Sequence, residues 1–288
     1  MANKARFVIA ESSIKIFFKN ATAKVFTTAQ LSEILEENRI SWKLPASMNV
    51  DKFKSKLIDS QILETKNIVF NGAVLDRERY VGLEASIFQI ALSLSNKSFL
   101  SHFTAAYLHG LTNQIPKVVY VSTEQSNKSV VKNELKQEAI DIAFSKPQRK
   151  SGSVSNYGDY SFLLHEGKYS NRIGIYSMNN LNITNIERTL VDIAVRPGYA
   201  GGVDSVLDIY RKAIDKISVN KLVAILDKLD FIYPYHQAIG FYLERAGMDS
   251  KKLDVLRKRD MKYDFYLTYE MIEREYDANW RLYYPKGM

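Results

Sequence analysis

An Asn-Gly dipeptide at positions 71 and 72 constrains the first third of this chain more than any other feature. It separates two runs with strand character, ILETKNIVF and AVLDRERY. Asn-Gly is the pair best suited to the positive φ angles of a two-residue hairpin turn. Helical patterns fill the residues before it. The sequence therefore predicts three helices followed by a β-hairpin.

The three helices are predicted from their apolar spacing and their start signals. Residues 4–19 carry one apolar face, and a second helix is expected to begin at Thr27, whose hydroxyl can form a capping box with Gln30. Asn49 is a suitable N-cap for a third helix over 50–60. The residues of this third helix that we expect to face the core are Phe53, Leu57 and Ile58.

Three short helices and then a hairpin are typical of a winged helix-turn-helix, whose last helix enters the major groove of DNA. Lysines chiefly neutralise phosphates, whereas asparagine and serine can read base edges. We expect Lys52, Ser55 and Lys56 to contact DNA, with Asn49 and Ser55 as the candidates for base edges. The contacts expected from the hairpin are Lys66, Arg77 and Arg79. The same module can instead serve as a protein-interaction adaptor.

The length of 288 residues predicts two domains, which we place at residues 1–90 and 91–288. The second domain mixes predicted helices and strands, so the expected fold class is α+β: a winged helix-turn-helix followed by a larger mixed α/β domain. Its predicted strands are Val118–Val121, Ala139–Phe144, Tyr160–His165 and Arg172–Tyr176. Its predicted helices include one over residues 187–195, opened by a capping box of Thr184 and Glu187, and others near 203–215, 218–229 and 234–246. Residues 146–159 are expected to form a long exposed loop.

The net charge of +8 permits a nucleic-acid partner without establishing one. Residues 1–90 hold 13 basic and 10 acidic side chains, and residues 91–185 hold 10 and 6. The chain has no cysteine, which excludes disulfides, thiolate metal sites and cysteine nucleophiles. It shows neither a signal peptide nor an apolar run of about 20 residues, so we expect a cytoplasmic protein without a membrane partner.

Three segments after residue 90 form a further set. The first is SHFTAAYLHGL (101–111), followed by Ile115-Pro116 and the strand VVYV. The second is ITNIERTLVD (183–192), followed by Pro197 and Gly201-Gly202, and the third runs from FYLTYE to WRLYYP. In this set, and in the place and size of the N-terminal module, the chain resembles the AbiEi antitoxins of type IV toxin–antitoxin systems, which are linked to abortive phage infection.

The resemblance implies an antitoxin that is also an autorepressor: it would bind its own promoter and repress its operon. It also implies a nucleotidyltransferase-like toxin as the functional partner, opposed without a stable complex between the two proteins. Such a protein is not an enzyme, needs no cofactor and no metal, and is nucleoid-associated when it is bound to operator DNA.

A Mg²⁺-dependent nuclease of a defence system is the alternative among enzymes. Glu166 and Lys168 at a strand end, with Asp141 or Asp159 upstream, are the skeleton of such a site. Gly152-Ser153 lacks the Asp-x-Asp that a nucleotidyltransferase needs, so the chain does not look like the toxin of the pair. His102 and His109 are expected to cap or pack rather than to bind a metal.

Overall fold

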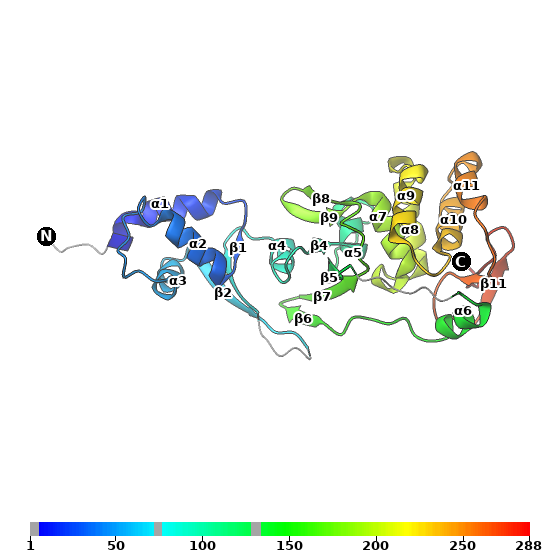
Figure 1. Cartoon of the computed structure of the whole chain (residues 1–288), viewed down its shortest axis with the longest axis horizontal. Helices are drawn as coiled ribbons and strands as arrows, with labels where there is room; N and C mark the ends of the chain where they lie inside the picture. Colours follow the sequence, from blue (N-terminus) through cyan, green and yellow to red (C-terminus); the bar gives the residue numbers. More distant parts are fainter. Residues whose placement is uncertain (1–5, 72–76, 128–133) are drawn as a thin grey trace.

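The structure is a computed structural model that describes residues 6–71, 77–127 and 134–288. The molecule is elongated, with an N-terminal unit at one end, a six-stranded sheet in the middle and a group of helices toward the other end (Figure 1). Helices and strands are mixed along the chain, in agreement with the predicted α+β class. Across the described ranges, no helix is both long enough and apolar enough to span a bilayer.

The N-terminal unit consists of three helices and a small antiparallel sheet with the strand order β1-β3-β2. Its elements are α1 (Arg6–Asn20), β1 (Val25–Phe26), α2 (Thr28–Asn38), α3 (Val50–Asp59), β2 (Leu63–Ile68) and β3 (Arg77–Gly82). The core of the unit is rich in aromatic rings, and Trp42 stacks on Phe53 with 5.9 Å between ring centroids. Burial of these large side chains is the main favourable contribution to holding the short helices together.

Local capping begins two of these helices where the sequence predicts. Thr27 forms the complete capping box with Gln30 at the start of α2. The Asn49 side chain accepts a hydrogen bond from the Lys52 amide at the start of α3, with 3.0 Å between donor and acceptor. Each cap satisfies a backbone donor that the helix itself leaves without a partner.

The central sheet has the strand order β6-β7-β5-β4-β9-β8. Its strands are β4 (Phe99–Leu100), β5 (Val118–Glu124), β6 (Val154–Tyr157), β7 (Tyr160–Gly167), β8 (Ile175–Met178) and β9 (Leu181–Thr184). The pairs β5–β7 and β4–β9 are parallel, and the other neighbouring pairs are antiparallel. Helix α5 (His102–Leu108) contacts β5 and also α7 (Ile186–Val195).

The remaining elements lie mainly toward the C-terminal end of the molecule (Figure 1). They are α6 (Gln137–Phe144), η1 (Pro197–Tyr199), α8 (Val203–Ala213), η2 (Ile214–Lys216), α9 (Val219–Leu229), α10 (Tyr235–Arg245), α11 (Ser250–Arg257), β10 (Phe265–Tyr266), β11 (Arg274–Asp277) and β12 (Leu282–Pro285). The last three strands form a separate sheet with the order β10-β12-β11. Helices α7, α8, α9, α10 and α11 share one large apolar core.

The N-terminal unit and the central sheet are joined by a common core. Helix α4 (Ile87–Leu92) contributes Ile90 and Ala91 to a cluster that also contains Val81 of β3 and Val121 of β5. The Asn71 amide donates to the Val154 carbonyl of β6 at 2.9 Å. The boundary predicted at residue 90 therefore falls inside a helix whose buried side chains touch both units.

The structure corrects two expectations in the N-terminal unit. Strands β2 and β3 pair as predicted, but Ile68 pairs with Arg77, whereas a two-residue turn at Asn71 and Gly72 would require it to pair with Leu75. Gly72 itself lies outside the described residues. Ile58 does not face the core, because 38% of its surface is exposed while Phe53 and Leu57 are fully buried.

Three further corrections concern residues 91–288. Residues 139–144 are helical in α6, although Ile140, Ile142 and Phe144 alternate as in a strand. Residues 154–157 form β6 within the stretch predicted to be a loop. Helix α7 is capped by Asn185, whose side chain accepts from the Arg188 amide at 2.8 Å, rather than by a capping box of Thr184 and Glu187.

Candidate functional site

The exposed face of α3 is one candidate site. Phe53 and Leu57 anchor the helix in the core, which leaves Lys52, Ser55 and Lys56 exposed on the surface. Lys52 Nζ donates to the Ser47 carbonyl at 3.2 Å, in a bond that is itself exposed. The three side chains occupy positions i, i+3 and i+4, and thus lie on one face of the helix.

The polar side chains of this face make contacts within the helix. The Ser55 hydroxyl donates to the Asp51 carbonyl at 3.0 Å, and Lys56 Nζ lies 3.7 Å from the Asp59 carboxylate. The Asn49 amide oxygen is occupied as the helix cap. Exposed pairs such as Lys56 with Asp59 contribute about 0–1 kcal/mol, so a phosphate can displace the carboxylate at low cost.

Two of the three hairpin residues, Arg77 and Arg79, are held more firmly than the lysines of α3. Lys66 Nζ lies 2.7 Å from the Glu64 carboxylate, and the Arg77 guanidinium lies over the Phe70 ring at 5.2 Å from its centroid. Arg79 donates two hydrogen bonds to the Ser93 carbonyl, at 3.0 and 2.7 Å. Burial, and to a smaller extent the neighbouring Arg77, lower the pKa of Arg79. Arg79 thus ties the hairpin to the end of α4.

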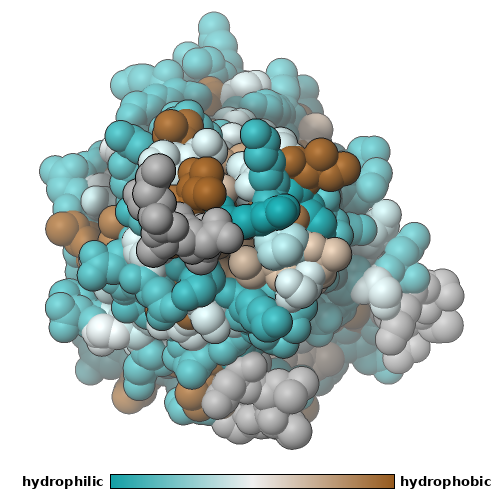
Figure 2. Space-filling view, turned by 90° about the vertical axis from the view of Figure 1, so that its left-hand side faces the viewer, coloured by the Kyte–Doolittle hydropathy of each residue, from teal (hydrophilic) through white to brown (hydrophobic). Residues whose placement is uncertain are grey.

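The end of the molecule formed by the N-terminal unit is mostly hydrophilic, with separate hydrophobic spots (Figure 2). The exposed apolar side chains of this unit include Val8, Ile9, Ile16 and Ile40. Since these spots do not merge into one large patch in this view, the face suits a charged partner better than an apolar one.

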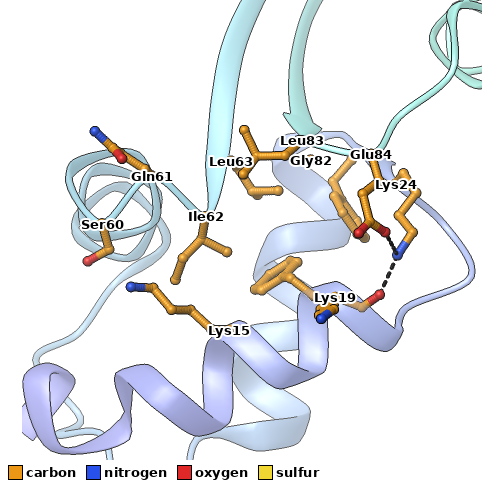
Figure 3. A pocket seen from close by; sticks show the side chains of 12 residues that line it. Lys15, Lys19, Lys24, Ser60, Gln61, Ile62, Leu63, Gly82, Leu83 and Glu84 are labelled. Atoms are coloured by element: carbon orange, nitrogen blue, oxygen red, sulfur yellow. Dashed lines mark hydrogen bonds and ion pairs between the residues drawn. The ribbon is translucent and has the colours of Figure 1, made fainter.

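A pocket of about 360 Å³ lies beside α1, between the end of α3 and the end of β3. Figure 3 shows Lys15, Lys19 and Lys24 around it, with Ile62 and Leu63 among its apolar lining. The Lys24 ammonium donates to the Lys19 carbonyl and lies 3.7 Å from the Glu84 carboxylate. Its charge is therefore used to join β1 to the segment after β3.

The residues proposed for a nuclease site are not brought together. Asp159 precedes β7 and Glu166 lies near the far end of that strand, so roughly 20 Å of extended chain separates them. Asp141 lies on α6 and accepts hydrogen bonds from Gln137 and Tyr266, both within 2.9 Å. In the described parts of the chain, no group of three His, Asp or Glu side chains is arranged to hold a metal ion.

A second candidate site is a cluster of buried polar and aromatic side chains at one end of the parallel strands β5 and β7. His102, His165 and Tyr199 pack with their ring centroids 5.2–5.7 Å apart. The Ser101 hydroxyl lies 2.8 Å from His102 Nδ1 and 2.7 Å from the Ser122 hydroxyl. Ser101 is the N-cap residue of α5, but its side chain joins this network and makes no capping hydrogen bond.

An ion pair on α7 continues the cluster. Arg188 and Asp192 are almost completely buried, with 2.7 Å between Nε and the carboxylate oxygen. Arg188 also donates to the Ser170 hydroxyl and to the Ile173 carbonyl. Gly174 allows its backbone to lie close to the Arg188 side chain, because a Cβ at position 174 would lie 2.7 Å from the Arg188 Cβ. Ser170 in turn donates to the Glu124 carboxylate.

Burial and nearby arginines keep the two histidines in the neutral form. Burial, followed by the charges of Arg196 and Arg188, lowers the pKa of His165 to about 4. Burial and neighbouring cations, including His165 when it is protonated, place the pKa of His102 well below its usual value. Both imidazoles are therefore neutral at pH 7, and each offers one hydrogen-bond donor and one acceptor.

These polar groups line a pocket of about 500 Å³, which we call the central pocket. From the sequence, His102 is predicted only to cap or pack, and no role is predicted for His165, Arg188 or Arg196. The partial signals were the motifs SHF and ERTLVD, which carry His102, Arg188 and Asp192. Nothing local in the sequence indicates that β5, β7, α5 and α7 bring these residues to one place.

No family model matches the chain, and no curated protein matches it. Among solved structures, the chain is similar to the crystal structure of the RV2827C protein from Mycobacterium tuberculosis. The TM-score is 0.58 at 14% sequence identity, and the match covers 96% of this chain and 91% of that one. At this identity the likeness concerns the fold alone, and it extends over nearly the whole length of the mixed α+β chain.

Proposed function

We propose that residues 1–90 form a winged helix-turn-helix that binds operator DNA through α3. The observation that carries this proposal is the exposed row of Lys52, Ser55 and Lys56 on a helix fixed by a capping asparagine and two buried apolar side chains. The antiparallel pair β2–β3 follows this helix, as the wing does in such modules.

The three residues of the row have different roles in the proposed DNA binding. Lys52 and Lys56 would neutralise phosphates, and their exposed ammonium groups can exchange internal partners for DNA. Ser55 is the better candidate for a base edge, since the Asn49 oxygen is committed to the helix start. Arg79 is left out of the proposed surface because its guanidinium is bound to the Ser93 carbonyl.

We further propose that the chain is the antitoxin and autorepressor of a type IV toxin–antitoxin operon, opposing a nucleotidyltransferase-like toxin without a stable complex. The support is the resemblance of three segments to AbiEi antitoxins. Two of them form α5 and α7, which pack together beside the central sheet. Co-expression with the product of the adjacent gene tests this part: rescue of growth without co-purification is expected.

The DNA-binding part is tested by a gel shift with the DNA upstream of the gene. We expect the double variant Lys52→Ala, Lys56→Ala to lose retention at moderate salt. The matched control is Lys251→Ala, Lys252→Ala on α11, which removes the same charge from another exposed helix. The control should bind like the parent chain.

The salt dependence of binding distinguishes phosphate contacts from indirect effects. For each lost contact, the slope of log K against log salt is expected to become shallower by about 0.9. Unchanged retention by a folded double variant would remove α3 from the proposal. Failure of the parent chain to bind any upstream DNA would favour the protein-interaction adaptor.

The nuclease alternative receives no support from the positions of its residues. Lys168 donates to the Asp230 carbonyl, Asp141 lies on α6, and Asp159 precedes β7 while Glu166 lies near its other end. Incubation of the purified protein with plasmid and Mg²⁺ is expected to leave the DNA intact. Cleavage that disappears in a Glu166→Ala variant would reverse this conclusion.

A further inference from the structure

We propose that the central pocket binds a small organic phosphate with an aromatic body, about the size of a nucleoside monophosphate. This inference is independent of DNA binding by α3. It rests on the charges around the pocket, on its ring-rich lining and on a floor of side chains already held in place by hydrogen bonds.

The cationic groups come from two elements. Arg196 follows α7, where its guanidinium lies 5.4 Å from the centre of the Tyr199 ring and donates to the Arg149 carbonyl at 2.8 Å. Lys168 follows β7 and is 44% exposed. The neutral His165 adds a ring nitrogen that can donate. Donors thus converge on the pocket from α7 and from the end of β7.

Carboxylates also line the pocket, and most of them are matched by donors. Asp192 pairs with Arg188, and Asp230 lies 3.8 Å from Lys168. Glu124 accepts hydrogen bonds from the Ser170 hydroxyl and from the Arg172 amide. Glu166 is exposed at the rim. At His165, burial lowers the pKa most, followed by the charges of Arg196 and Arg188.

The apolar part of the lining comes from β4, the end of α7, the end of α9 and the connection between α9 and α10. It includes Phe99, Val195, Leu229, Phe231 and Ile232. A volume of about 500 Å³ with an apolar lining and a few converging polar groups is typical of a small-molecule site. The aromatic body of a ligand would contact this lining and the imidazole rings.

The floor of the pocket is preorganised. The Ser101 hydroxyl, which is itself bonded to the Ser122 hydroxyl, holds His102 through Nδ1, and Arg188 is held by Asp192, Ser170 and the Ile173 carbonyl. His102 has a φ of +50°, a conformation that side-chain-bearing residues seldom adopt. Side chains fixed in this way pay little additional entropy when a ligand binds.

Phosphate fits these donors better than carboxylate does. A single arginine fork can satisfy a carboxylate. Here a guanidinium, an ammonium and an imidazole come from separate elements, an arrangement that suits a tetrahedral anion with three terminal oxygens.

The test uses the full chain and isothermal titration calorimetry at pH 7. The probes are the four common nucleoside monophosphates, the matching nucleosides, inorganic phosphate and benzoate. We expect at least one monophosphate to bind about tenfold or more tightly than its nucleoside and than inorganic phosphate, since both the anion and the ring contribute. Equal binding of nucleoside and monophosphate, or binding of benzoate in preference, would overturn the proposal.

Variants locate the ligand. Arg196→Gln should weaken monophosphate binding about tenfold or more, and Lys168→Gln, at an exposed position, should weaken it less. The control Lys117→Gln lies before the start of β5 and should bind normally. If Arg196→Gln fails to fold, the binding measured for Lys168→Gln alone tests whether the ligand lies in the central pocket. Unaltered binding by the folded variants, or no monophosphate binding by the parent chain at ~1 mM, contradicts the proposal.

Discussion

The face of α3 and the central pocket use charge in opposite ways. On α3 the lysines are exposed, and the bonds they make are weak and exchangeable. In the central pocket Arg188 and Asp192 are buried, each depends on the other, and Arg188 also donates to the Ser170 hydroxyl. Exposed charges can be removed without harm to the fold, whereas a buried pair cannot lose one member cheaply. Substitutions on the face of α3 should therefore affect binding but not stability, whereas substitutions in the buried pair should affect stability.

The largest effect is expected from breaking the buried pair. Arg188→Met leaves the Asp192 carboxylate buried without its partner, and should reduce the free energy of unfolding by about 3–5 kcal/mol. Urea denaturation measures the loss. The double variant Arg188→Met, Asp192→Leu should regain most of the lost stability, because neither charge of the pair then remains buried. A loss below about 1 kcal/mol in the single variant would show that the pair is not the support we describe.

The second prediction concerns acid. The pKa of His165 is about 4 in the folded protein and near 6.5 when the chain is unfolded, so the unfolded chain binds more protons between these values. The contribution of His165 to stability is complete above pH 6.5 and falls by up to about 3 kcal/mol as the pH drops through 4.

The neutral variant His165→Gln isolates this contribution. Its stability should decline less steeply between pH 6.5 and 4 than that of the parent chain, as measured by urea denaturation at several pH values. Part of the decline remains, because the pKa of His236 is also lowered to about 4, mainly by burial and then by Arg259. Parallel curves for the two proteins would argue against a depressed pKa at His165.

A smaller effect is expected at the start of α3. Asn49→Ala removes the bond to the Lys52 amide and should cost about 1 kcal/mol in thermal or urea unfolding. Asn49→Ser can still cap the helix and should remain close to the parent chain. If alanine is as stable as serine here, the cap does not hold the helix that carries the proposed DNA contacts.

The smallest effect on stability is expected from the lysines themselves. Lys52→Ala combined with Lys56→Ala should change the free energy of unfolding by less than about 0.5 kcal/mol, since both side chains are exposed. The same protein is predicted to lose DNA retention. A loss of stability above about 1 kcal/mol would mean that these lysines support the fold, and the contrast with Arg188 would then fail.

The N-terminal unit could be read from the sequence to a large extent because its signals are local. Thr27 with Gln30, and Asn49 alone, begin helices through bonds within three residues. Phe53 and Leu57 follow the helical period and are buried. The prediction was wrong at Ile58, which lies at the edge of the buried face of the helix. The exposure of a side chain at such an edge depends on which other elements pack against the helix.

Residues 139–144 show why a local pattern can mislead. Ile140, Ile142 and Phe144 alternate as in a strand, but Ile140 and Phe144 are also one helical turn apart. In α6 these two are buried and Ile142 is 58% exposed. Gln137 holds the helix through two bonds to the backbone of Asp264, more than a hundred residues away. Contacts between residues this far apart in the sequence therefore favour the helical spacing over the strand alternation.

By itself, the sequence determined the α+β class, the helix starts of the N-terminal unit and the exclusion of thiolate chemistry. Those properties depend on composition and on neighbours a few residues apart. The tertiary structure alone decided that Arg79 binds the Ser93 carbonyl and that His102 and His165 share a pocket with Arg188 and Arg196. Each of these groups acquires its partners, its burial and its pKa only when separate strands and helices come together.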